Sequence, residues 1–224
     1  MKGFVQIAGV RNPEEARRIV DSGADALGFP FRLDHHAEDL SESEARDIIS
    51  RLAPSCRPIL ITYLNKAEEI LELARYLGVA GVQLHGGLGP RVGELIKAQA
   101  PDLWLIKSLV LRQGNEDSLI EALRNWGGIV DAFLTDTYDL QSGASGATGK
   151  VHDWKVSRRL VELSPKPLIL AGGLNSTNVA AAIAQVRPWG VDVHTGVEDS
   201  LGRKDSRLVQ EFVETARRAF ALLG

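Results

Sequence analysis

Two glycine-containing segments near the end of the chain have the residue types that bind phosphate. In "AGGLNSTNV", Gly172 and Gly173 follow an apolar run and precede a helical pattern. In "HTGVEDSLGRKD", Thr195 and Gly196 lie at the end of the next apolar run. Glycine lets backbone N–H groups approach an anion closely, and the N-terminus of a helix adds partial positive charge. The two segments therefore predict a phosphate site. The alternative is that these glycines only form tight turns.

A third segment, "DTYDLQSGASGATGKVHDW", is rich in Gly, Ser and Thr and nearly twenty residues long. The spacing of Gly143, Gly146 and Gly149 before Lys150 does not match the phosphate-binding loop of nucleotide hydrolases. Loops of this length in compact domains are often functional. We expect a lid over a sugar phosphate, with a plain flexible loop as the alternative.

The elements that would position these segments repeat along the whole chain. Apolar runs without polar alternation, typical of buried parallel strands, alternate with amphipathic helical patterns. The expected strands are Phe4–Ile7, Ala26–Phe29, Ile59–Tyr63, Ala80–Leu84, Leu103–Ile106, Val130–Thr135, Pro167–Ala171 and Val191–Thr195. Eight units in 224 residues, about 28 residues each, favour a single-domain α/β fold over residues 1–224, the (β/α)8 TIM barrel. An open doubly wound sheet is the alternative.

Helix signals support this division of the chain. Asn12 and Pro13 are typical of a helix start, and Ser41 with Glu44 three residues later predicts a capping box. Active sites of such barrels lie at the carboxyl ends of the strands. Four of the five histidines lie directly at the ends of the expected strands or in the loops after them, and the fifth, His152, lies in the loop after the sixth strand.

Composition limits the classes of partner. Apolar residues make up 44% and charged residues 25%, and the net charge of −3 gives no reason to expect nucleic acid or a membrane as a partner. The single cysteine, Cys56, suits a reducing compartment, and the N-terminus does not resemble a signal peptide. We expect a cytoplasmic protein, and both a monomer and a homodimer remain open.

Seven strings in order resemble one family, phosphoribosylanthranilate isomerase, a barrel enzyme of tryptophan biosynthesis. They are "GVRNPEEA", "GADALGF", "VQLHG", "DAFLTDT", "GATGKVHDW", "LAGGLNSTNV" and "GVDVHTGVEDSLGRKD". The resemblance implies an Amadori rearrangement of a small phosphorylated sugar, without a metal or an organic cofactor. It also implies that Asp136, at the end of the sixth strand, is the general acid. A partly desolvated carboxyl can keep its proton near neutral pH; the alternative for Asp136 is a helix or loop cap.

The sequence departs from the family at its general base. The family has cysteine in a Lys-Ile-Cys-Gly pattern after the first strand, whereas this chain reads Gln6-Ile7-Ala8-Gly9. Ala8 cannot accept a proton. Cys56 precedes the third strand, so we expect it at the opposite end of the barrel.

Other candidate residues have two interpretations each. The family places an arginine in the loop after the second strand to bind the anthranilate carboxylate; here Arg32 comes early, and His35 and His36 fall near that place. The histidines are candidates for an anion contact or a base, or are simply solvated. We expect Lys107, after the fifth strand, to face the mouth, with a buried ion pair as the alternative. His85 matches the family in "QLHG" and is expected at the rim.

Two further residues lie in the matched strings. His194 stands where the family often has serine, and either adds a donor to phosphate or fills space. Asp153 is expected to order the lid.

Three functions follow from these patterns. The first is the family isomerase, with the base recruited elsewhere or the cysteine deliberately replaced. The second is a related enzyme for another phosphorylated sugar, suggested by the changed second loop. The third is a phosphosugar-binding protein without activity.

Overall fold

Eight parallel strands close into a barrel in the computed structural model, which describes residues 3–33, 38–137 and 153–224. The strands are β1 (Phe4–Ala8), β2 (Ala26–Phe31), β3 (Arg57–Thr62), β4 (Gly81–Leu84), β5 (Trp104–Leu111), β6 (Ala132–Thr137), β7 (Leu168–Leu170) and β8 (Gly190–Val193). Each strand pairs with the next along the chain, and β1 pairs with β8. The expected (β/α)8 barrel is confirmed.

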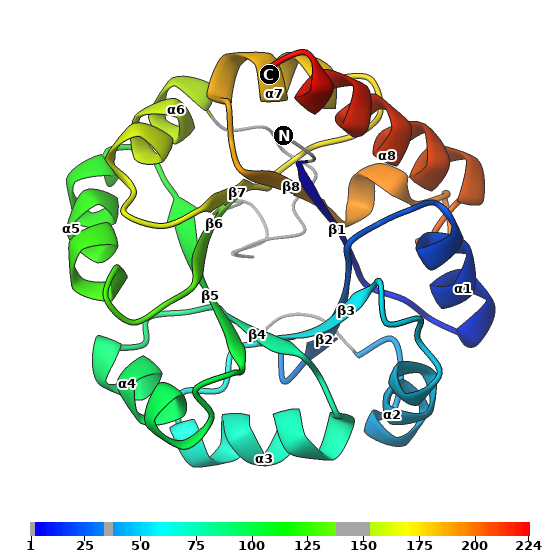
Figure 1. The fold of residues 1–224 in the computed structure, drawn as a ribbon, viewed down its shortest axis with the longest axis horizontal. Coiled ribbons are helices and arrows are strands. Elements are labelled where there is room, and N and C mark those ends of the chain that lie inside the picture. Colours follow the sequence, from blue (N-terminus) through cyan, green and yellow to red (C-terminus); the bar gives the residue numbers. More distant parts are fainter. Residues whose placement is uncertain (1–2, 34–37, 138–152) are drawn as a thin grey trace.

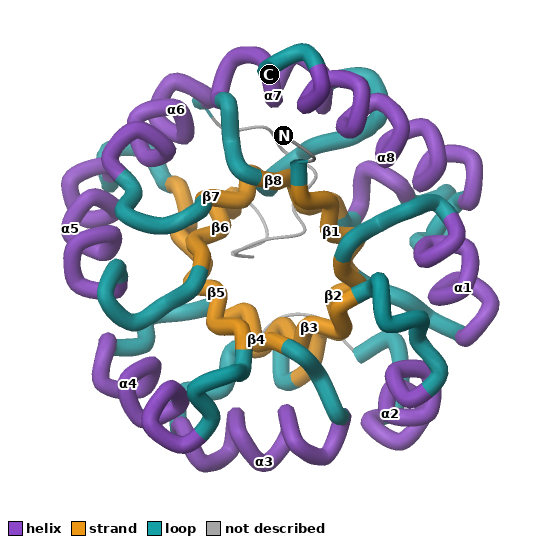
Figure 2. The backbone as a smooth tube through the Cα atoms, viewed as in Figure 1, coloured by secondary structure: helices purple, strands orange, loops and turns teal. Residues whose placement is uncertain are grey.

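The helices form an outer ring around the strands (Figure 1). They are α1 (Pro13–Asp21), α2 (Glu42–Ser50), α3 (Ala67–Leu77), α4 (Pro90–Gln99), α5 (Glu116–Trp126), α6 (Trp154–Leu163), α7 (Val179–Val186) and α8 (Ser206–Ala221), with a short 3-10 turn, η1 (Thr195–Val197). Figure 2 shows the loops that join the two rings. No helix within the described ranges is long and apolar enough to cross a membrane.

The expected helix starts are present. The Asn12 side chain accepts a hydrogen bond from the Glu15 N–H. Ser41 and Glu44 cap one another as the sequence predicts. These bonds satisfy amide groups that the first turn of a helix leaves without a partner.

Some strands are longer than the sequence indicates. β5 runs to Leu111 rather than Ile106, and β6 includes Asp136 and Thr137, because the two strands stay paired up to Leu111 and Thr137. Polar residues within β5 hide this extension in an apolarity pattern, although backbone pairing does not depend on side-chain polarity.

The inside of the barrel is apolar at one end and polar at the other. Phe4, Trp104 and Trp189 lie at the amino ends of their strands; the rings of Phe4 and Trp189 stack at 4.9 Å, and Trp104 meets Phe4 edge-on at 5.3 Å. Above them lie small and branched apolar side chains such as Ile106 and Leu134. Because the amino end is filled in this way, polar side chains inside the barrel are concentrated toward the carboxyl ends of the strands.

Candidate active site

Asp136 points into the barrel from near the end of β6. Its alternate neighbours Ala132 and Leu134 belong to the interior cluster, whereas Phe133 packs outward with the helices. The carboxyl accepts a hydrogen bond of 2.8 Å from the Thr137 N–H. Burial raises the pKa of Asp136 to about 7, an effect opposed by the Thr137 bond and reinforced by the charge of Asp192. Asp136 can therefore hold a proton at neutral pH.

A chain of hydrogen bonds crosses the barrel toward this carboxyl. The Gln6 Nε2 donates to the Gln83 Oε1 (2.8 Å), and the Gln83 Nε2 lies 2.8 Å from the Nε2 of His85. Since an amide NH₂ is only a donor, Nε2 of His85 is the acceptor, and the Ser108 hydroxyl, at 3.0 Å, donates to it as well. This assignment leaves the ring proton on Nδ1.

The Nδ1 of His85 faces Asp136. It lies 3.9 Å from the Asp136 Oδ2 and has no hydrogen-bond partner within the described part of the chain. Burial, with the positive charge of Lys107, lowers the pKa of His85 to about 3, so the ring is neutral. The ring also stacks on Tyr63 at 5.1 Å. His85 is thus a buried donor aimed at the carboxyl and not a residue of the outer rim; its expected substrate contact stays a prediction.

A second carboxyl, which the sequence analysis missed, lies inside the barrel on β8. Asp192 pairs in register with Gln6, and Val191 and Val193 on either side pack outward. Burial raises the pKa of Asp192 to about 7, while a hydrogen bond from the Gln6 side chain and the charge of Lys204 lower it. An acidic residue within an otherwise apolar expected strand is the signal that could have identified it.

Ala8 ends β1 at the same mouth. It pairs with Gly28 of β2 and is 5% exposed, so its methyl group faces the interior without any proton-accepting atom. Cys56 cannot replace the family cysteine, as expected: it lies directly before β3, at the amino end, and burial beside Asp25 raises its pKa to about 12.

The two glycine segments meet one another. Gly172 and Gly173 have positive φ angles of 96° and 66°, which favour glycine, and the Asn178 side chain donates to the Gly173 carbonyl at 2.9 Å. A side-chain carbon at Gly196 would lie only 1.8 Å from the Leu174 oxygen. This close approach joins the loops after β7 and β8, as a shared anion site requires.

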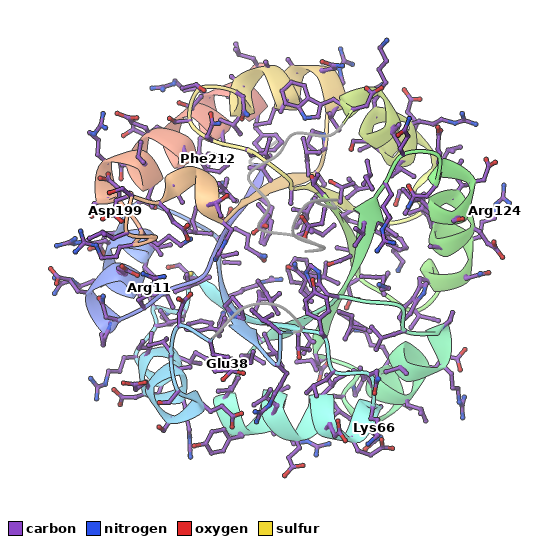
Figure 3. All side chains as sticks on the ribbon, turned by 180° about the vertical axis from the view of Figure 1, so that it is seen from behind. Arg11, Glu38, Lys66, Arg124, Asp199 and Phe212 are labelled. Carbon is purple, nitrogen blue, oxygen red and sulfur yellow. The ribbon has the colours of Figure 1, made fainter. Side chains whose placement is uncertain are left out.

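The loop after β8 is fixed by a buried cation. The Lys204 Nζ donates to the His194 carbonyl (2.9 Å) and to the Glu198 carboxylate (2.7 Å). Arg11, after β1, donates to the carbonyl of Leu201 at 2.8 Å. Figure 3 labels Arg11 and, in the loop after β8, Asp199, which lie near one another. These contacts hold Thr195, the first residue of η1, beside the β1 end.

The expectation for Lys107 is wrong. β5 continues past it, and Lys107 alternates with Ser108, which bonds to His85 inside, so Lys107 faces outward toward the helices. Its Nζ donates to the carbonyls of Gly86 (3.0 Å) and Ser108 (2.9 Å) and lies 5.7 Å from the Trp126 ring centroid. Burial lowers its pKa to about 8. Within the described ranges no ion pair holds it, so the alternative of a buried ion pair is not observed there.

Arg32 begins the loop after β2 with a positive φ of 58°. Its guanidinium pairs with Glu42 at the start of α2, and its N–H donates to Glu38 at 2.9 Å. His35 and His36 lie outside the described residues, as does the expected lid. Asp153, just after that segment, caps α6 by accepting a bond from the Lys155 N–H.

Comparison with known proteins decides the family. A family model described as N-(5'-phosphoribosyl)anthranilate (PRA) isomerase matches residues 5–215. The chain belongs to this family. N-(5'-phosphoribosyl)anthranilate isomerase 2 of Methanosarcina mazei is 37% identical over 96% of this chain and 95% of its own length. The crystal structure of the isomerase from Thermotoga maritima has a TM-score of 0.82 at 33% identity, covering 96% of this chain and 99% of that one.

Another solved isomerase of this family bears on the chemistry of the mouth. That protein was crystallised with reduced 1-(o-carboxyphenylamino)-1-deoxyribulose 5-phosphate; it is 31% identical, with a TM-score of 0.80 over 96% of this chain and 99% of its own. The family thus consists of aldose–ketose isomerases of tryptophan biosynthesis with the barrel described above.

Proposed function

We propose that this chain isomerises N-(5'-phosphoribosyl)anthranilate, with Asp136 as the general acid. The observation that carries the proposal is the Asp136 carboxyl at the carboxyl end of the barrel, whose pKa burial raises to about 7, so that it can hold a proton near neutral pH, and which faces the His85 donor. A carboxyl in that state can protonate the ring oxygen of a bound furanose.

The phosphate of the substrate is assigned to the loops after β7 and β8. The positive φ angles of Gly172 and Gly173 and the close contact at Gly196 support this assignment, and Thr195 adds a hydroxyl beside them. The anthranilate half is then assigned to the loop after β2, where Arg32 and His36 remain the proposed contacts for its carboxylate.

The chemical steps follow from this placement. Asp136 protonates the ring oxygen, the bond from that oxygen to C1′ breaks with its electron pair going to oxygen, and an iminium ion forms. A base then removes the C2′ proton, and the electron pair moves to give an enolamine. Transfer of the hydroxyl proton from O2′ to C1′, through solvent, yields the ketone. Protons balance, and neither an oxidant nor a reductant is consumed.

Turnover of phosphoribosylanthranilate, followed by loss of anthranilate fluorescence, tests the proposal. We expect measurable isomerisation and a kcat at least about 100-fold lower in Asp136→Asn, because an amide cannot give up a proton in this way. Asp21→Asn, an exposed carboxyl at the end of α1, is the matched control and is expected to change nothing. An unchanged rate in Asp136→Asn would remove the acid assignment.

A further inference from the structure

The reaction proposed above needs a group that takes the C2′ proton, and Ala8 cannot supply it. Among the residues that the structure describes inside the upper barrel, the side chains able to exchange a proton are Asp136, His85 and Asp192, with His194 at its rim. The proposed function already assigns Asp136 as the general acid. His85 accepts two hydrogen bonds at Nε2, so it has no free lone pair. Asp192 remains.

Asp192 lies at the same height as the acid. Counted along the parallel registers of β6, β7 and β8, Asp136 and Asp192 are both level with Ala171, the residue after β7. Neighbouring strands lie about 4.8 Å apart, so roughly 10 Å of backbone separates the two carboxyls, with only a methyl group from Ala171 between them. A reactant bound between β6 and β8 would thus have one carboxyl on each side.

Asp192 also lies on the strand next to position 8, where this chain has alanine in place of the family cysteine. Its strand pairs with β1, where Gln6 is its partner and Ala8 is the next inward residue. Ala8 ends at Cβ, so it presents no reactive atom above Gln6. A carboxylate on the adjacent strand is therefore placed to act where the family has its cysteine.

One oxygen of this carboxyl is unused. Asp192 is 7% exposed, and its Oδ1 has no hydrogen-bond partner in the described ranges. Leaving a buried oxygen without a partner is unfavourable, so such an atom in a native protein calls for an explanation such as a functional role. The Gln6 amide, which also donates to Gln83, orients the carboxyl.

We propose that Asp192 is the general base that takes over the role of the missing cysteine at position 8. This inference rests on the proposed function and extends it. The Asp192 carboxylate takes the proton from C2′; the C–H electron pair becomes the C1′–C2′ double bond, and the iminium π pair returns to nitrogen. The protonated carboxyl then returns its proton to solvent.

His194 is the competing candidate. It is the next residue of the same inward series, but its ring packs on Gly9, where an added side-chain carbon would lie 2.5 Å from Nε2. The same Nε2 lies 3.7 Å from the Glu198 carboxylate. The ring is therefore held between the β1 end and the loop after β8, whereas Asp192 lies in the barrel interior, two strands from Asp136.

The charges that act on Asp192 come from two elements. Asp136 on β6 is a second carboxyl, whose pKa the charge of Asp192 raises. Lys204, from the loop after β8, is a cation that lowers the pKa of Asp192, and Gln6 of β1 lowers it as a neutral hydrogen-bond donor. Asp136 disfavours a second negative charge, while Lys204 and Gln6 favour the ionised form of Asp192. The ionised form of Asp192 that Lys204 and Gln6 favour is the form that a general base needs.

The test compares Asp192→Asn in two backgrounds, the natural chain and Ala8→Cys, with turnover of phosphoribosylanthranilate as the readout. In the natural chain we expect Asp192→Asn to lower kcat at least 100-fold and to change KM by less than 3-fold. In the Ala8→Cys background, where the thiol provides the base, we expect the same substitution to lower kcat by less than 10-fold. Asp192→Glu keeps a carboxylate and is expected to retain part of the activity. His194→Ala is expected to lower kcat less than 10-fold.

Each other outcome overturns the proposal. Equal losses in both backgrounds would mean a structural role, and so would loss of the folded state in both Asp192 variants. A selective loss in His194→Ala would transfer the role to that histidine. Turnover by Ala8→Cys alone would mean that no group replaces the cysteine while the proposed function stands. No turnover by either chain would remove the proposed function as well.

Discussion

At the scale of single residues, burial inside the barrel raises the pKa of two carboxyls because it removes them from water. Asp136 and Asp192 differ from ordinary surface aspartates only in their surroundings, yet burial raises the pKa of each from 3.8 to about 7. A group with a raised pKa binds its proton more tightly in the folded than in the unfolded state. Catalytic readiness and pH-dependent stability therefore come from the same desolvation.

The sign of this linkage gives a prediction for Asp136. The stability that Asp136 gains from binding its proton more tightly in the folded state is fully present below pH 3.8 and is lost as pH rises through about 7. The pKa difference corresponds to roughly 4 kcal/mol. We therefore expect Asp136→Asn, which cannot ionise, to be more stable relative to the natural chain at pH 8.5 than at pH 4.5. Urea unfolding at both pH values measures this; an equal difference at both would contradict it, and Asp21→Asn is the control.

Sequence reasoning identified one carboxyl and missed the other. Asp136 was found because a family motif surrounds it, not because its burial was visible in the residue pattern. Asp192 lies within "GVDV", where an apolarity count takes it as part of a buried strand. Which side of the sheet a residue faces depends on register, and a one-residue error reverses it, as the placement of Lys107 shows.

At the scale of elements, strand–loop–helix units place the glycines of two loops in contact. The contact at Gly196 has no room for a methyl group, since its carbon would lie 1.8 Å from the Leu174 oxygen. The existence and order of these units could be predicted from helix caps and apolar runs. The contact between loops could not, because it depends on how two units pack.

We expect Gly196→Ala to separate the loops after β7 and β8 and to weaken phosphate binding. The inhibition constant of inorganic phosphate should rise at least about 10-fold, and KM should rise by more than kcat falls, since the reacting atoms lie on other strands. Gly128→Ala is the matched control because an added carbon there meets nothing within 4 Å. An unchanged phosphate affinity in Gly196→Ala would contradict the phosphate assignment.

At the scale of the whole molecule, the two ends of the barrel have different tasks. The carboxyl end holds the polar groups described above. The amino end is closed by aromatic rings and by Arg217 of α8, which donates to the Gly3 and Gly23 carbonyls and pairs with Asp25. Asp25 in turn accepts a bond of 2.9 Å from the Val5 N–H of β1. This cluster ties the last helix to the first two strand units.

Separation of the two ends predicts that Arg217→Met lowers stability without lowering turnover. The side chain is 20% exposed, and its loss removes the cation that pairs with Asp25 and the donor to two carbonyls, so we expect a decrease of about 2 to 4 kcal/mol in the free energy of unfolding. The neighbouring Arg218→Met is the matched control: that side chain is 71% exposed and lies 3.8 Å from Glu214, and exposed pairs contribute about 0 to 1 kcal/mol.

Urea unfolding and steady-state turnover, measured on the same samples of both variants, decide this prediction. Because Arg217 acts at the amino end, kcat and KM of the folded Arg217→Met protein should stay within about 2-fold of the natural values. A large fall in kcat while the protein is still folded would show that the closure of the barrel at β1 also sets the geometry of its mouth. In that case stability and catalysis would be coupled through β1, the strand that pairs with Asp192 and ends at Ala8.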